Sequence, residues 1–302
     1  MVGRFSLPET SYNLQSAAVT IRTALAEAIA ALEQAGVEHA SANAEWLMAH
    51  VLDCPRSELP LYRARILGKD QLNRWRDLVA RRAQRVPLQH LLGTAEFCGL
   101  EFEVSRAVLV PRPETELLAE AAWSVAAMNE GARVLDIGTG SGCLAVSIAV
   151  HVADSVVQAV DISRNALAVA QANAARHGVE KRITFHEADA RKGLPGECFF
   201  DVIVSNPPYI PTVEIGSLQA EVRDHDPHLA LDGGVDGLEF YRSLITICLP
   251  RLRPDGRFML EVGDDQAASV AGLIEAKGGR VLEIVPDLNN IERIVVASPG
   301  NS

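Results

Sequence analysis

Five consecutive residues, Ser205-Asn206-Pro207-Pro208-Tyr209, carry the side chains best suited to chemistry. They follow the apolar run Asp201–Val204, which is typical of a buried parallel strand. Two prolines end such a strand, because neither can donate a hydrogen bond and both fix φ. The Asn206 side-chain oxygen and the Pro207 carbonyl would then form a paired acceptor for a planar NH2 group, with the Tyr209 ring to hold it. The alternative is a proline-terminated strand with a buried tyrosine.

A glycine-rich segment, Asp136-Ile137-Gly138-Thr139-Gly140-Ser141-Gly142, lies between a predicted strand and a predicted helix. Glycines let the backbone approach a ligand closely, and a helix start offers unpaired N–H groups. The Gly-x-Gly-x-Gly spacing differs from the Gly-x-Gly-x-x-Gly of dinucleotide-binding proteins, and the segment lacks the lysine of a P-loop. A dinucleotide-dependent oxidoreductase is therefore disfavoured.

Two further acids follow the next two predicted strands. Asp161 is placed to accept the hydroxyl groups of a ribose, and Asp189, followed by Ala190, could help to bracket an adenine edge. Each acid alone is more often a loop or cap residue. Together with Asp136 and the glycine turn, they predict a nucleoside site at one edge of the sheet.

The composition indicates a globular protein of about two domains, with 302 residues of which 48% are hydrophobic. No run of 18 apolar residues is present, so we expect no membrane span, and no secretion signal is evident. Five scattered cysteines without a CxxC pair indicate a reducing, cytoplasmic location and no metal site. The net charge of −11 disfavours direct binding to nucleic acid.

The N-terminal region, residues 1–86, is predicted to be a small helical recognition domain. Its helices are expected over 17–34, from Ser41 or Asn43 through Leu52, and over 70–84, where Leu72, Trp75 and Val79 face inward. Residues 63–85 hold eight basic and two acidic side chains, a local balance of +6 that leaves −17 for the rest. A solvated helix face or a docking face for an acidic or RNA-associated partner would explain them.

Residues 87–110 are predicted to form a β-hairpin linker, with strands near 96–97 and 101–104, and residues 111–302 a second domain that opens with a helix at Pro113. Strands and helices then alternate, which predicts a mostly parallel, doubly wound α/β sheet of seven strands. We expect the last two strands to pair antiparallel because a short loop joins them. The expected strands are 133–137, 156–160, 182–186, 201–205, 256–262, 280–285 and 291–297, and helices are expected to begin near Gly142, Ser163, Gly237 and Asp265.

The glycine turn, Asp161 and Asp189 resemble those of class I S-adenosylmethionine-dependent methyltransferases, and Asn206-Pro207-Pro208-Tyr209 resembles the motif of the branch that methylates planar NH2 groups. Two more segments, 93–116 and Leu229-Ala230-Leu231-Asp232-Gly233-Gly234, make nearly the whole chain similar to the release-factor glutamine methyltransferases.

The resemblance implies a Rossmann-like fold and methyl transfer from S-adenosylmethionine to the glutamine of the Gly-Gly-Gln loop of peptide chain release factors. It implies cofactor binding by Asp136, Gly138, Thr139, Gly140, Ser141, Gly142, Asp161, Asp189, Ala190 and Asn206. It further implies that Asn206, Pro207, Pro208 and Tyr209 hold the glutamine. Ala190 stands where the family often has a larger, aromatic side chain.

Three alternative functions remain open from the residues. A glutamine of a large-subunit ribosomal protein could be the target, as in the sibling family. The same four residues also suit an exocyclic base amine, as in a nucleic-acid amino-methyltransferase. A non-catalytic nucleoside-binding adaptor would need the helical region more than the chemistry.

Overall fold

The structure of the protein, a computed structural model, describes residues 19–300. They form two compact units that divide after Leu88. The hairpin expected to be a separate linker therefore belongs, from Gln89 onward, to the larger unit. None of the helices in the described part of the chain is both long and apolar enough to cross a membrane.

The first unit consists of helices, as its sequence predicts. Thr20 caps the first helix by accepting a 3.3 Å hydrogen bond from the Thr23 main-chain N–H, so this helix begins later than expected. The expected residues 17 and 18 lie outside the described part. The helices are α1 (Ile21–Gln34), α2 (Ala40–Leu52), η1 (Arg56–Glu58), α3 (Leu59–Tyr62) and α4 (Lys69–Ala83).

Two details of this unit differ from the sequence-based expectation. Helix α2 begins at Ala40, so neither Ser41 nor Asn43 caps it; Asn43 is buried inside the helix and accepts a 2.8 Å hydrogen bond from Arg82 Nε. Arg82 is only 6% exposed, so this member of the basic stretch holds α4 against α2. On α4 the buried residue beside Trp75 is Leu78 rather than the expected Val79.

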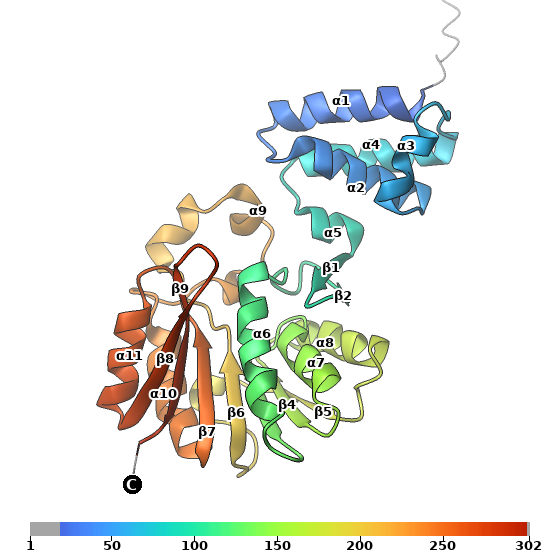
Figure 1. The fold of residues 1–302 in the computed structure, drawn as a ribbon. Helices are drawn as coiled ribbons and strands as arrows, with labels where there is room; N and C mark the ends of the chain where they lie inside the picture. Colours follow the sequence, from blue (N-terminus) through green and yellow to red (C-terminus); the bar gives the residue numbers. More distant parts are fainter. Residues whose placement is uncertain (1–18, 301–302) are drawn as a thin grey trace, which may run out of the picture. The chain divides into compact units, whose positions relative to one another are not determined.

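The second unit is built on the seven-stranded sheet that the alternating pattern predicts. Its strand order is β5-β4-β3-β6-β7-β9-β8, with β9 antiparallel to both of its neighbours (Figure 1). The strands are β3 (Arg133–Ile137), β4 (Val156–Asp161), β5 (Ile183–Glu187), β6 (Phe200–Ser205), β7 (Leu252–Glu261), β8 (Gly279–Pro286) and β9 (Glu292–Pro299). Strand β7 begins four residues before the expected Gly256, and its pairing with β6 is irregular there, where Pro254 has no N–H to donate.

Helices cover the sheet on both faces, which accounts for the continuous apolar runs of the central strands. On one face lie α6 (Pro113–Ala126), α7 (Cys143–His151) and α8 (Arg164–Arg176), packed through residues such as Leu118 and Ile148. On the other lie α10 (Glu239–Cys248) and α11 (Ala267–Ala276), packed through Leu244 and Val270 (Figure 1).

Short elements at the carboxyl edge of the sheet complete the unit. Helix α5 (Leu88–Leu92) leads into the hairpin of β1 (Thr94–Phe97) and β2 (Leu100–Glu103), close to the expected strands. Between β6 and α10 the chain forms η3 (Thr212–Ser217), α9 (Ala220–Arg223) and η4 (His228–Ala230), none of which has a clear periodic signal in the sequence.

Candidate functional site

A cavity of about 160 Å³ lies at the carboxyl ends of β3, β4 and β6. Segments widely separated in the sequence meet around it, as expected for a parallel sheet whose strand ends share one edge. Eight of the residues singled out from the sequence line it: Gly138, Gly140, Asp161, Asp189, Ala190, Asn206, Pro207 and Pro208.

The remaining candidates lie behind the cavity wall rather than in it. Thr139, Ser141 and Gly142 are buried within the turn, and Asp136 is completely buried beneath it. Tyr209 does not line the cavity. Its ring packs against the apolar core on the α10 and α11 face, and burial raises the pKa of its phenol to about 12. Tyr209 is half-buried in this position.

The Asn206–Tyr209 corner is held firmly at its far end. The Tyr209 carbonyl accepts a 2.9 Å hydrogen bond from Gln266 Nε2. A Cβ atom on Gly237 would lie 2.4 Å from the same carbonyl oxygen, and one on Gly233 would lie 2.8 Å from the Tyr209 Cα. Backbone contacts this close require glycine. Gly233 and Gly237 therefore pack directly against the backbone of Tyr209.

The near end of the corner is held through the Asn206 side chain. Its Nδ2 donates a 3.1 Å hydrogen bond to Oγ1 of Thr115, in the first turn of α6. The NH2 group is thus engaged by α6, and Asn206 itself lines the cavity.

Asp136 fixes the glycine turn from below. Its Oδ2 accepts hydrogen bonds from Thr139 Oγ1 (2.6 Å) and from the Ala145 main-chain N–H (3.2 Å), while its buried Oδ1 has no partner among the described residues. Burial raises the pKa of this carboxyl to about 7, against the opposing effect of those hydrogen bonds. The turn is thus built on an acid whose ionisation burial disfavours.

Asp161 joins the end of β4 to the glycine turn. Its carboxylate accepts hydrogen bonds from the main-chain N–H groups of Gly140 (2.9 Å) and Ser163 (2.8 Å). Burial raises its pKa, and these two hydrogen bonds oppose the rise. A carboxylate has about four lone-pair sites, so acceptor capacity remains for a hydroxyl group of a ligand in the cavity.

The carboxylate of Asp189 forms hydrogen bonds within the protein that its position in the sequence did not indicate. Arg191 Nε and Nη2 donate to its two oxygens at 2.9 and 3.0 Å, and these hydrogen bonds lower the pKa of Asp189 to about 2. The guanidinium of Arg191 lies 4.9 Å from the centre of the Phe240 ring. Ala190, Arg191 and Phe240 all line the cavity. The planar guanidinium of Arg191 and the ring of Phe240 therefore form a wall beside Ala190, the position where the family often has an aromatic side chain.

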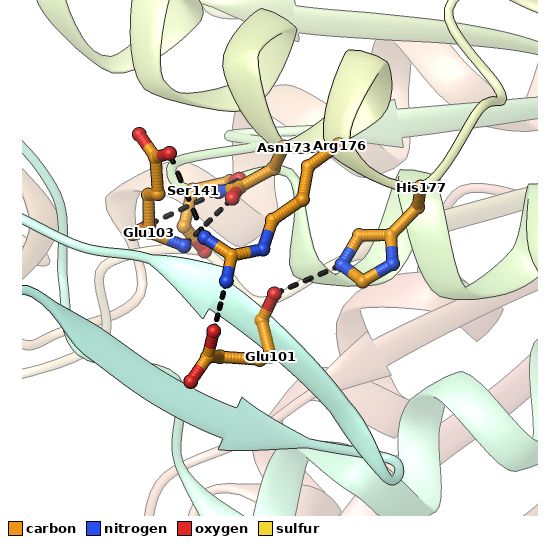
Figure 2. A network of polar contacts seen from close by, with 6 residues as sticks. All are labelled: Glu101, Glu103, Ser141, Asn173, Arg176 and His177. Atoms are coloured by element: carbon orange, nitrogen blue, oxygen red, sulfur yellow. Dashed lines mark hydrogen bonds and ion pairs between the residues drawn. The ribbon is translucent and has the colours of Figure 1, made fainter. Parts of the chain in front are cut away.

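The β-hairpin is bonded to the glycine turn through α8 (Figure 2). Asn173, fully buried on α8, accepts from the Glu103 main-chain N–H (2.7 Å) and donates to the Glu103 carbonyl (3.0 Å) and the Ser141 carbonyl (2.8 Å). Arg176 pairs with Glu101 and Glu103, and His177 bonds the Glu101 carbonyl at 2.9 Å. One side chain therefore connects β2 to the turn beside the cavity.

Several lining residues were not identified as site residues from the sequence. Most are apolar, and no spacing distinguishes them from core residues. Ser163 is marked only as a helix cap, and Leu229 and Ala230 only by the family segment that contains them. The lining residues not identified in this way are Ala107, Val108, Leu109, Ile137, Val160, Ile162, Ser163, Ala166, Ala188, Arg191, Ser205, Pro227, Leu229, Ala230, Phe240 and Leu244. Within residues 19–300, His, Cys, Asp and Glu side chains form no group of three that could hold a metal ion.

Comparison with known proteins identifies both units. Residues 23–93 match the PrmC N-terminal domain, and residues 114–233 match the methyltransferase small domain. The fold is shared with a methyltransferase from Pyrococcus furiosus (TM-score 0.51, 20% identity, 74% of this chain and 99% of that one). It is also shared with the catalytic domain of hMettl16 (TM-score 0.56, 18% identity, 75% and 83%).

Relatives of similar length are more informative than these structures. The release factor glutamine methyltransferase of Geobacter sulfurreducens is 44% identical over 276 residues, which cover 91% of this chain and 95% of the relative. Those of Koribacter versatilis (39%; 94% and 100%) and Bradyrhizobium diazoefficiens (38%; 98% and 98%) match over a similar extent. By this similarity across both units, the chain belongs to the release factor glutamine methyltransferase family.

Proposed function

We propose that the protein transfers a methyl group from S-adenosylmethionine to the side-chain amide nitrogen of the glutamine in the Gly-Gly-Gln loop of peptide chain release factors. The observation that carries the proposal is the similarity to relatives of that name over both units. The position of Asn206 and Pro207 on the wall of the cavity supports it. The protein would encounter release factors in the cytoplasm.

The polar groups around the cavity suit S-adenosylmethionine. Asp161 has lone pairs left for ribose hydroxyls, and the glycine turn presents main chain to the cavity at Gly138 and Gly140. Asp189, Ala190 and Arg191 would border the adenine. The buried Oδ1 of Asp136 leaves an acceptor without a partner beneath the turn. When bound there, S-adenosylmethionine supplies an electrophilic methyl group.

The residues of the corner would hold the glutamine amide. An amide nitrogen is a weak nucleophile because its lone pair is delocalised into the carbonyl. Asn206 Oδ1 and the Pro207 carbonyl would accept its two hydrogens and aim the nitrogen at the methyl carbon. Positioning of this kind can supply about 7–11 kcal/mol of the barrier reduction in favourable cases. As the bond from nitrogen to the methyl carbon forms and the sulfur–methyl bond breaks, the nitrogen gains positive charge, so both oxygens bind it more strongly and favour the transition state over the ground state. Loss of one amide proton would then give the N-methyl amide, with S-adenosylhomocysteine as the leaving group.

The helical first unit would recognise the release factor outside the loop. Its match to the PrmC N-terminal domain supports this role. The exposed members of the basic stretch, such as Arg74 and Arg76 on α4, would be available to an acidic surface of the partner.

Incubation with S-adenosylmethionine labelled in its methyl group tests the proposal. Purified release factor should gain one methyl group on the loop glutamine, located by mass spectrometry of its peptides. A factor in which that glutamine is replaced should gain none. Equal labelling of both factors would contradict the proposal. Label that enters only a ribosomal protein, or only RNA or DNA, would assign the alternative substrates.

A further inference from the structure

The segment between β6 and α10 presents apolar side chains to solvent beside the cavity. Val213, Leu229 and Val235 are 84%, 67% and 80% exposed. Leu229 also lines the cavity, so it lies where the cavity opens to solvent. Figure 1 shows this segment, which contains α9, beyond the carboxyl ends of the strands. Exposed apolar side chains gathered beside a cavity mark a surface on which another molecule can bind.

Hydrogen bonds within the segment fix these side chains in place. The Thr212 main-chain N–H donates a 2.9 Å hydrogen bond to the Gly234 carbonyl, so Val213 and Val235 follow two residues that are bonded to each other. Asp232 Oδ1 accepts from the Thr212 hydroxyl (2.7 Å) and from the Gly234 main-chain N–H (3.0 Å). A surface that is already ordered loses less conformational entropy when it binds a partner.

The same segment is strongly acidic. Residues 206–240 contain seven acidic side chains and one basic side chain, a balance of −6. Two exposed carboxylates, those of Glu214 and Glu239, form no ion pair with a basic residue of the described part of the chain. Three other acids are paired with arginines: Asp224 with Arg223, Asp226 with Arg112, and Asp236 with Arg242.

Each exposed valine has one of the two unpaired carboxylates next to it. Glu214 follows Val213 directly, and the Glu239 carboxylate accepts a 3.3 Å hydrogen bond from the Val235 main-chain N–H. Such a surface is complementary to a partner in which basic side chains flank apolar ones. A nucleic acid fits it poorly, because the carboxylates would repel the phosphates.

We propose that Val213, Leu229, Val235, Glu214 and Glu239 form a docking surface for the part of the release factor that flanks the target glutamine, and that this part carries apolar and basic side chains. The inference rests on the proposed function, in which the glutamine reaches the corner at residues 206–209. It adds the chemistry of the residues around that glutamine.

Kinetics with intact release factor tests the apolar part of the surface. The double variant Val213→Ser/Val235→Ser should raise the KM for release factor by about tenfold, while kcat and the Kd for S-adenosylmethionine change less than about twofold. Val156→Ser is the matched control, since Val156 is 50% exposed but lies at the opposite, amino end of β4. An unchanged KM in the double variant, an equal rise in the control, or an equal loss of donor affinity would overturn the inference.

A change of charge tests the acidic part. Glu214→Lys should raise the same KM by about fivefold at low ionic strength, and the difference should shrink at about 0.5 M salt because salt screens exposed charges. Glu180→Lys, which changes an exposed acid before the amino end of β5, is the control and should leave the KM unchanged. Equal KM values for the two variants at low ionic strength would overturn the assignment of a basic partner.

Binding of short probes separates this inference from the proposed function. Fluorescent peptides of sequence Lys-Val-Gly-Gly-Gln-Val-Lys and Glu-Val-Gly-Gly-Gln-Val-Glu differ only in the sign of their charge. We expect fluorescence anisotropy to show about tenfold tighter binding of the basic peptide, and this preference should weaken in Glu214→Lys. Equal binding of both peptides, or tighter binding of a single-stranded RNA of similar length, would overturn the inference. Preference for the basic peptide without methylation of release factor would contradict only the proposed function.

Discussion

The main-chain N–H of Gly140 donates a 2.9 Å hydrogen bond to the carboxylate of Asp161, although the two residues are 21 positions apart. The glycine turn after β3 and the acid after β4 are thereby parts of one structure. The residue proposed to bind the ribose is thus also the residue that shapes the neighbouring loop.

Replacing Asp161 should therefore weaken donor binding in two ways. We expect Asp161→Ala to raise the Kd for S-adenosylmethionine by about 10- to 100-fold, because a charged acceptor for the ribose and the partner of Gly140 are both lost. Isothermal titration calorimetry measures the change. Glu187→Ala at the end of β5, an exposed acid paired with Arg164, is the control and should leave the Kd unchanged. Equal Kd values for wild type and Asp161→Ala would contradict this role.

Replacing Asn206 should have the opposite profile. Asn206→Ala removes the side-chain oxygen that would accept a hydrogen of the target amide, and we expect kcat to fall by about tenfold or more while most donor affinity remains. Single-turnover methylation of release factor, combined with a donor titration, measures both. Equal losses of donor affinity in Asn206→Ala and Asp161→Ala would refute the division of labour between the corner and the turn. Melting curves must show that both variants fold.

Gly142 should tolerate no side chain. Its φ is +80°, and an added Cβ would lie 3.0 Å from the Cβ and 3.2 Å from the Cα of Ala170 on α8. Gly178 has a similar φ of +68° with nothing within 4 Å, so it isolates the backbone cost. We expect Gly178→Ala to lower the free energy of unfolding by about 1–2 kcal/mol and Gly142→Ala by a larger amount. Urea denaturation measures both free energies of unfolding. Equal losses would show that α8 can move away from the added methyl group without a further loss of stability.

Asn173 should be essential for stability although it lies outside the cavity. Asn173→Ala removes the hydrogen-bond partner of three main-chain groups, one buried and two part-buried, and we expect a loss of about 2–4 kcal/mol. Asn129→Ala, which removes one 3.2 Å hydrogen bond to the Val125 carbonyl, should cost less than about 1 kcal/mol. Similar denaturation midpoints for the two variants would show that the hairpin is held by other contacts.

The ligand-free protein should lose stability as the pH rises from about 4 to 7. Burial raises the folded-state pKa of Asp136 and of Glu261 to about 7 and that of Asp226 to about 6. Over this range the folded state binds more protons than the unfolded chain, so the free energy of unfolding falls as pH increases. Each such group can contribute up to about 1.4 kcal/mol per pH unit.

Asp136→Asn checks the contribution of the acid beneath the turn. It should flatten part of the pH dependence in urea denaturation between about pH 4 and 7. The groups with lowered pKa, such as Asp189 and Asp236, act below this range and should not mask the effect. An unchanged slope in Asp136→Asn would show that Asp136 is ionised in the folded protein.

The sheet could be predicted almost completely from the sequence because its signals are local. Buried parallel strands appear as apolar runs, and Gly178 or Pro113 mark helix ends directly. The strand ends then bring Asp161 and Asn206 to one edge by topology alone. Errors occurred where a local signal competes with tertiary packing: Asn43 has the chemistry of a cap, yet it is buried in α2 by its bond to Arg82.

The support of the site could not be predicted in this way. Thr115 is an ordinary residue of a first helical turn. Its hydrogen bond to Asn206 joins residues 91 positions apart in the sequence. Arg191 likewise follows Asp189 closely in sequence, but its contact with Phe240 depends on how α10 returns to the sheet.

The antiparallel insertion of β9 between β7 and β8 has a consequence for synthesis of the chain. Within residues 19–300, strand β8 pairs only with β9, and one edge of β7 also pairs with β9. During translation both strands emerge before their partner exists, so their open edges are exposed until the final strand is made. Ribosome-bound chains that stop before Glu292 should therefore lack the protease resistance that the released protein gains.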